Sequence, residues 1–102
     1  MQEPQKGFYY HYKHDPTKGI NNYAYEVIGL GRNTEEGTFT VLYRPLYESE
    51  WMPPADFQSR PLEMFSDKNF EKDGKIIPER FIKITDEKVI SELIKIRDEM
   101  YK

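Results

Sequence analysis

The chain has 102 residues, a length typical of one domain, and a formal net charge of −3. This charge gives no general attraction to phosphate backbones or anionic lipids, so nucleic-acid binding would require a local basic patch. Cysteine is absent, which excludes disulfides, thiolate catalysis and sulfur-ligated zinc and fits a reducing compartment. No run approaches the roughly 18 apolar residues of a membrane span, and the polar start lacks the apolar middle of a signal peptide. We therefore expect a cytoplasmic protein with no membrane partner.

The first half of the sequence has the residue pattern of β-strands. Aromatic residues crowd positions 7–13, and turn-forming residues follow at 14–19. A second strand is predicted over Tyr23–Leu30. Its two faces would carry Tyr23, Tyr25 and Val27, or Ala24, Glu26, Ile28 and Leu30. Gly29 and Gly31 then permit a bulge, and the hairpin loop Asn33–Gly37 leads into a third strand over 38–47, whose end Pro45 confines to an edge or a bend.

The second half predicts shorter elements and one clear helix. An ordered loop is expected over 48–59, and residues 60–65 begin with a short strand or a turn of helix. Short closing strands are predicted at Ile76–Ile77 and Phe81–Ile84. Thr85 or Asp86 can cap a final helix. One side of this helix is apolar and carries Val89, Ile90, Leu93, Ile94, Ile96, Met100 and Tyr101.

Arg97 lies in the middle of that apolar stripe. There it must extend toward solvent, meet a carboxylate, or meet another chain, so the stripe is also a candidate dimer seam. The domain plan is a disordered N-terminus over 1–6, a mainly β domain over 7–84, and a C-terminal helix over 85–102 that packs on the same domain.

Several short stretches share the order and spacing of a known family. They are Tyr10-His11-Tyr12-Lys13, Tyr25-Glu26-Val27-Ile28-Gly29, Thr34-Glu35, Val41-Leu42-Tyr43-Arg44, Leu46-Tyr47, Trp51, Arg60-Pro61-Leu62-Glu63-Met64-Phe65 and Arg80-Phe81. Together they cover residues 7–84 and resemble the uncharacterised bacterial domain of unknown function 1653. The resemblance implies a mainly β fold, a small SH3-like barrel, and no established biochemical activity.

The sequence departs from the family pattern in three places. The loop over 14–22 is longer than the usual turn, and residues 52–59 are inserted between the tryptophan and the Arg-Pro pair. Asn33 stands where many members have a histidine, which places a site dependent on that histidine in doubt. The C-terminal helix lies outside the resemblance.

Tyrosine is the most distinctive feature of the predicted strands. Seven phenols, more than one small barrel can enclose, occur at Tyr9, Tyr10, Tyr12, Tyr23, Tyr25, Tyr43 and Tyr47. An exposed tyrosine cluster near Trp51 would suit stacking on bases or gripping a peptide. The alternative is that each ring packs at the edge of the core with its hydroxyl in water.

Two arginines, Arg44 and Arg60, each precede a proline. If their strands meet at one end of the barrel, the two guanidinium groups could form an anion-binding pair with His11 and Lys13. The alternative is a set of separate surface salt bridges with Glu26, Glu48 or Glu63.

No catalytic or metal-binding signature stands out, and no cofactor is implied. His11 and His14 with Asp15 would need a turn between them to converge on a metal. The pair Gly29 and Gly31 lacks the third glycine and the helix of a phosphate loop, and no serine has a nucleophile context. Whether the protein is an enzyme stays open, with the balance against it.

We predict a non-catalytic binding module for a peptide or protein partner. The alternative is recognition of nucleic acid or a nucleotide through an aromatic and basic face, and a small hydrolase or transferase is less favoured. The candidate binding residues are Tyr10, His11, Tyr12, Lys13, Arg44, Trp51 and Arg60. The sequence does not fix the oligomeric state.

Overall fold

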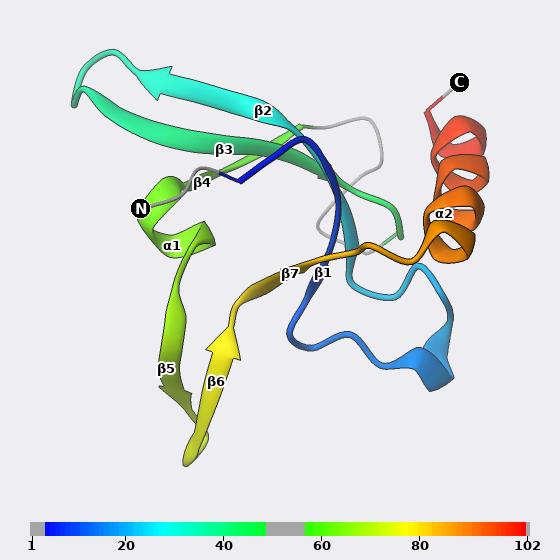
Figure 1. Ribbon diagram of the computed structural model, residues 1–102. Helices are drawn as coiled ribbons and strands as arrows, with labels where there is room; N and C mark the ends of the chain where they lie inside the picture. Colours follow the sequence, from blue (N-terminus) through cyan, green and yellow to red (C-terminus); the bar gives the residue numbers. More distant parts are fainter. Residues whose placement is uncertain (1–3, 49–56, 102) are drawn as a thin grey trace.

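A computed structural model describes residues 4–48 and 57–101 (Figure 1). One five-stranded antiparallel sheet has the order β4-β3-β2-β1-β7, and β5 and β6 form a separate hairpin. The strands are β1 (Gly7–His11), β2 (Ala24–Asn33), β3 (Thr38–Pro45), β4 (Gln58–Pro61), β5 (Lys68–Lys72), β6 (Lys75–Glu79) and β7 (Phe81–Lys83). The helices are a 3-10 turn (Pro16–Lys18), α1 (Leu62–Phe65) and α2 (Glu87–Met100). The fold is mainly β, as the sequence predicted.

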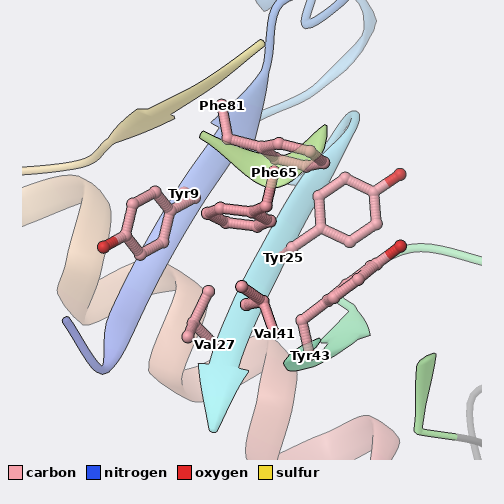
Figure 2. Close-up of a cluster of buried hydrophobic side chains, with 7 residues drawn as sticks. All are labelled: Tyr9, Tyr25, Val27, Val41, Tyr43, Phe65 and Phe81. Atoms are coloured by element: carbon pink, nitrogen blue, oxygen red, sulfur yellow. The ribbon is translucent and has the colours of Figure 1, made fainter. Parts of the chain in front are cut away.

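Strand alternation gives the sheet an inner and an outer face. The inner face holds a buried cluster of seven apolar side chains: Tyr9, Tyr25, Val27, Val41, Tyr43, Phe65 and Phe81 (Figure 2). The outer face holds a second buried cluster, Phe8, Ala24, Leu46, Ile84 and Leu93, the last of which comes from α2. The sheet curls around the inner cluster as a half-barrel, which is the SH3-like architecture expected from the family resemblance.

A β-bulge in β2 changes which residues face inward. Val27 pairs with Tyr43, but the next pair is Gly29 with Leu42, so one residue of β2 is left over between them. Because an extra residue reverses the alternation, Leu30 packs against the inner cluster with Val27 and not on the opposite face. The predicted bulge at the glycines is confirmed, and the predicted placement of Leu30 beside Glu26 is wrong.

The predicted C-terminal helix is confirmed as α2. The Asp86 side chain accepts hydrogen bonds from the backbone N–H groups of Lys88 and Val89, which caps the first turn. Leu93 is fully buried, and its apolar neighbours along the stripe pack on the outer face of the sheet. The stripe considered as a dimer seam is therefore used within the molecule. Among the described residues, no helix is long and apolar enough to cross a membrane.

Two short elements after β4 complete the inner cluster. Residues 60–65 form both structures that the sequence allowed, because β4 ends at Pro61 and α1 follows at once. This turn of helix buries Phe65, whose ring stacks on Phe81 with centroids 4.2 Å apart. The β5–β6 hairpin turns at Asp73 and Gly74, which both have positive φ, the conformation of a tight two-residue hairpin.

The N-terminal segment contributes to this fold through Gln5. Its backbone oxygen accepts a hydrogen bond from the Tyr9 hydroxyl, and its side chain accepts one from Lys83. The disorder predicted for residues 1–6 stays a prediction for 1–3, which lie outside the described residues.

Candidate functional site

The predicted binding residues do not form a single face. His11 and Arg60 lie on the inner side of the sheet, since they pair in register with Phe81 and Val41 of the inner cluster. Tyr10 and Arg44 point to the outer side. Tyr12 and Lys13 follow the end of β1, and Trp51 lies outside the described residues. The hypothesis of one aromatic and basic face over Tyr10–Lys13, Arg44 and Arg60 is therefore not supported by the strand geometry.

Arg44 is engaged in a salt bridge on the outer side. Its Nε donates to Glu26 Oε1 over 2.9 Å, and its guanidinium lies 4.0 Å from the centroid of the Tyr101 ring. The other oxygen of Glu26 accepts from Arg97 Nη1, also over 2.9 Å. The predicted anion pair of Arg44 with Arg60 is wrong, because the two guanidinium groups lie on opposite sides of the sheet. The alternative, a salt bridge with Glu26, is confirmed for Arg44.

Tyr10 and its neighbours anchor loops. The Tyr10 hydroxyl donates to the backbone oxygen of Ile20, and its ring stacks on His14 with centroids 3.6 Å apart. The Tyr12 ring packs edge-on against Phe70 of the β5–β6 hairpin. Lys13 is exposed, and its backbone N–H donates to His11 Nδ1. These contacts hold the segment that follows β1 in place.

The eight tyrosines of the protein are all buried or half-buried. Contacts with other aromatic rings are made by Tyr9, Tyr10, Tyr12, Tyr23, Tyr25, Tyr43 and Tyr47. Tyr25, for example, makes edge-on contacts with Tyr43, Tyr47 and Phe81 at centroid distances of 5.3–5.7 Å. Such ring pairs add stability beyond the area that they bury. The rings therefore serve the core and its rim, as in the second of the two sequence-based interpretations, and they do not form an open stacking surface.

Arg60 has different surroundings from Arg44. It extends from the edge strand β4 across the inner cluster, with its guanidinium carbon 5.4 Å from the centroid of the Phe81 ring. Its Nε is fully buried and makes no hydrogen bond within the described residues. Arg60 also forms no ion pair among residues 4–48 and 57–101. Buried polar atoms are almost always hydrogen-bonded in native proteins, so the unpartnered Nε of Arg60 calls for a specific explanation.

His11 lies close to Arg60 at the same end of the cluster. Its ring contacts Tyr23 and Phe81 at centroid distances of 5.6 and 5.1 Å. Burial lowers the pKa of His11 to about 4, and the positive charges of Arg60, Lys13 and Arg80 contribute to the lowering. The imidazole is therefore neutral near neutral pH. Because Nδ1 accepts the Lys13 N–H, the remaining proton lies on Nε2, which is a hydrogen-bond donor.

Two tyrosine hydroxyls complete this end of the cluster. Tyr25 and Tyr47 share a hydrogen bond of 2.5 Å between their hydroxyl oxygens. Burial raises the pKa of both phenols, so both stay protonated. Whichever hydroxyl accepts in this bond keeps its own proton to donate elsewhere. Figure 2 shows the Tyr25 and Tyr43 hydroxyls pointing to the same side of the cluster, while the Tyr9 hydroxyl points to the opposite side.

We call this end of the half-barrel the Arg60 mouth and define it by five residues: His11, Tyr23, Tyr25, Tyr47 and Arg60. Of these, His11 and Arg60 were among the residues predicted from the sequence, and the three tyrosines were not. The alternation of the predicted strand Tyr23–Leu30 already placed Tyr23 and Tyr25 on one face. The pairing that brings that face to His11 and Arg60 was not visible in the sequence.

A cavity of about 710 Å³ lies at the opposite end of the inner cluster. Tyr9, Phe65 and Phe81 form its wall toward the cluster, and Gln5 and Lys83 lie at its rim. None of the predicted binding residues that the structure describes lines it. The stacked rings of Phe65 and Phe81 thus have the cavity on one side and the Arg60 mouth on the other.

Comparison with known proteins assigns the protein to a family. The family model described as protein of unknown function (DUF1653) matches residues 7–83, which span the whole half-barrel. The protein belongs to the DUF1653 family. A crystal structure of a DUF1653 protein from Bordetella bronchiseptica is similar, with a TM-score of 0.59 and 27% sequence identity over 85% of this chain and 99% of that one. No curated protein matches the sequence.

Asn33 has a structural role in this DUF1653 protein. Its side-chain oxygen accepts hydrogen bonds from the backbone N–H groups of Glu35 and Glu36, which closes the β2–β3 hairpin turn. Figure 1 shows that this hairpin projects away from the rest of the sheet. Asn33 is therefore used here to cap a turn.

Proposed function

We propose that this DUF1653 protein is a non-catalytic binding module that engages a peptide segment of a protein partner at the Arg60 mouth. One observation carries the proposal: Arg60 extends over a wall of aromatic rings with a buried Nε that makes no hydrogen bond within the described residues. Its neighbours supply two neutral donors, the His11 Nε2–H and whichever of the Tyr25 and Tyr47 hydroxyls accepts in their shared hydrogen bond. A few convergent donors in an apolar surrounding are typical of a recognition site.

The same groups are poorly suited to catalysis. The raised pKa values of Tyr25 and Tyr47 leave their hydroxyls weak nucleophiles. The pKa of about 4 at His11 is far from the value near 7 at which a general base works best. These features favour binding over a hydrolase or transferase activity.

Recognition of nucleic acid is the second candidate, and the site favours it less. Binding to a phosphate backbone needs several free cations, and Arg44, which was to supply one, is held by Glu26. Base stacking needs open aromatic faces, and the tyrosines pack against one another.

A cytoplasmic location is part of the proposal and rests on the absence of cysteine.

A random peptide library displayed on phage tests the proposed function. Peptides selected on the full-length protein are titrated into ¹⁵N-labelled protein, and the amide signals that move are mapped. We expect shifts at His11, Tyr47 and Arg60, and loss of binding in Arg60→Gln. The matched control is Arg32→Gln, which removes an exposed arginine that lies over Phe39.

Two outcomes would overturn this proposal. One is that no peptide is enriched, or that the selected peptides move signals only at the helix face around Arg44. The other is that single-stranded RNA binds at the Arg60 mouth in a salt-dependent way, which would favour the nucleic-acid candidate.

A further inference from the structure

We infer that the group held at the Arg60 mouth is one carboxylate of the partner, supplied by an Asp or Glu side chain or by the partner's C-terminus. This inference rests on the proposed function and specifies its ligand. It depends on how Arg60 differs from the other arginines of the protein, and on which anion the donors of the mouth can match.

Arg60 is the exception among the partly buried arginines of the described ranges. Arg44 and Arg97 bind Glu26, and Arg80 binds Asp67 over 3.1 Å. Arg80 also has a buried Nε without a partner, but its charge is balanced through Nη2. Arg60 alone of these four has no carboxylate partner among residues 4–48 and 57–101. A partly buried cation that has no carboxylate partner among these residues gains more from an incoming anion than a fully exposed cation would.

The environment strengthens an ion pair at this position. The guanidinium lies over Phe81, and Tyr25 and Tyr47 form the neighbouring wall. Apolar rings exclude water and lower the local dielectric constant, which makes a charged hydrogen bond stronger than one in water. A guanidinium also presents paired N–H groups in a fixed plane, and these match the two oxygens of a carboxylate.

The number of charges at the mouth favours a carboxylate over a phosphate. Arg60 is one cation, and the other donors, the His11 Nε2–H and a tyrosine hydroxyl, are neutral. Arg80 is committed to Asp67, and Lys13 has an exposed side chain. One cation with neutral donors balances a single negative charge, whereas a phosphate monoester carries nearly two near neutral pH. The polar set of the mouth is thus complementary to a carboxylate.

Four short peptides test the inference by NMR at constant ionic strength. Acetyl-Gly-Glu-Gly-amide carries a side-chain carboxylate, and acetyl-Gly-Gly-Gly with a free C-terminus carries a terminal one. Their controls are the Gln peptide and the C-terminal amide. We expect the Arg60 Nε–Hε signal and the His11 ring signals to move with the acids and not with the amides. The acid peptide that binds more tightly identifies whether the carboxylate comes from a side chain or from a C-terminus.

Variants connect the effect to Arg60. We expect Arg60→Gln to weaken binding of the acid peptides about tenfold or more, because it removes a charged hydrogen-bond donor pair. Arg32→Gln should leave binding unchanged. Arg60→Lys keeps the charge without the planar pair, so it should bind more weakly than the wild-type protein. Thermal unfolding of each variant establishes that it is folded before binding is compared.

Several results would overturn the inference. They are equal shifts with the acid and amide peptides, unchanged acid binding in folded Arg60→Gln, or tighter binding of inorganic phosphate than of either acid. Failure here is separable from failure of the proposed function. Library peptides that bind the mouth but lack an acid would leave the binding module standing and reject the carboxylate. If the acid peptides shift the signals of the mouth but no library peptide is enriched, the carboxylate site stands and the peptide-binding module is rejected.

Discussion

Arg60 lies over the ring of Phe81, with its guanidinium carbon 5.4 Å from the ring centroid, although the two residues come from β4 and β7, the opposite edges of the five-stranded sheet. A flat sheet would hold these strands far apart, since neighbouring strands are about 4.8 Å from each other. The contact therefore shows that the sheet has curled enough to bring its two edge strands, β4 and β7, close together. It also explains how His11 of β1 and Arg60 of β4, which are not neighbouring strands, come together at the Arg60 mouth.

Replacing Arg60 with Gln should raise the pKa of His11 above its value of about 4. The positive charge of Arg60 disfavours the imidazolium, so its removal makes protonation easier. The pKa should remain below the ordinary 6.5, because burial is the larger cause of the shift and persists in the variant. An NMR titration of the His11 ring measures the value, and Arg32→Gln is the control. An unchanged pKa would mean that the guanidinium is not near the ring.

The lowered pKa of His11 also predicts how stability depends on pH. Between the unfolded pKa of 6.5 and the folded pKa of about 4, the unfolded state binds a proton that the folded state does not. The free energy of unfolding should therefore fall as the pH is lowered through this window. The loss is on the order of 2 kcal/mol after allowing for solvent screening of a partly exposed ring. Urea unfolding at several pH values should show a weaker dependence in His11→Gln, and equal slopes would contradict the prediction.

The sequence predicted the elements of this fold better than their relationships. Alternation located the main strands, and the apolar stripe located α2, because each is a local pattern. Alternation also separates the two faces of one strand, but it does not say which faces of two strands coincide. That is why Arg44 and Arg60 were grouped together, although the register pairs Arg44 with Glu26 and Arg60 with Val41. For Leu30 the prediction failed because the bulge in β2 reverses the alternation, which a local pattern does not reveal.

The tyrosine surplus shows the same limit of local patterns. Counting phenols indicated that some must reach the surface, and five of the eight are indeed only half-buried. What the count could not show is that the rings contact one another across the curled sheet. Tyr25 and Tyr47 meet through their hydroxyls although they are 22 residues apart in the sequence. The feature of the site that matters most, an arginine without a counterion among the described residues, depends on tertiary structure alone.

The hydrogen bond between Tyr25 and Tyr47 should be measurable by a double-mutant cycle. Tyr47→Phe leaves the buried Tyr25 hydroxyl without its partner and should lower the free energy of unfolding by about 1 kcal/mol. The double variant with Tyr25→Phe should lose less than the sum of the single variants, because no unpaired hydroxyl remains. Tyr12→Phe is the control, since its hydroxyl makes no bond within the described ranges. Additive losses would mean that the two hydroxyls act independently.

Glu26 should be the most important carboxylate for holding α2 on the sheet. It is 14% exposed and accepts hydrogen bonds from Arg44 of β3 and Arg97 of α2. Glu26→Gln leaves Arg44 without its counterion and leaves Arg97 with only the exposed Asp98, so it should lower the free energy of unfolding by about 2 kcal/mol. Glu92→Gln breaks the exposed pair with Lys95 and should change it by no more than about 0.5 kcal/mol. Similar losses in the two variants would contradict this assignment.

Phe65 should be essential to the inner cluster, although it comes from a helix of only four residues. It is 3% exposed, stacks on Phe81, and meets Tyr9 edge-on at 5.5 Å. Phe65→Ala would open a cavity between the Arg60 mouth and the existing cavity beside Tyr9, so it should cost about 3 kcal/mol or more. Its neighbour Met64 is 47% exposed, and Met64→Ala should cost less than about 1 kcal/mol. Chemical denaturation of both variants measures the difference. If they are equally stable, the short helix does not seal the half-barrel.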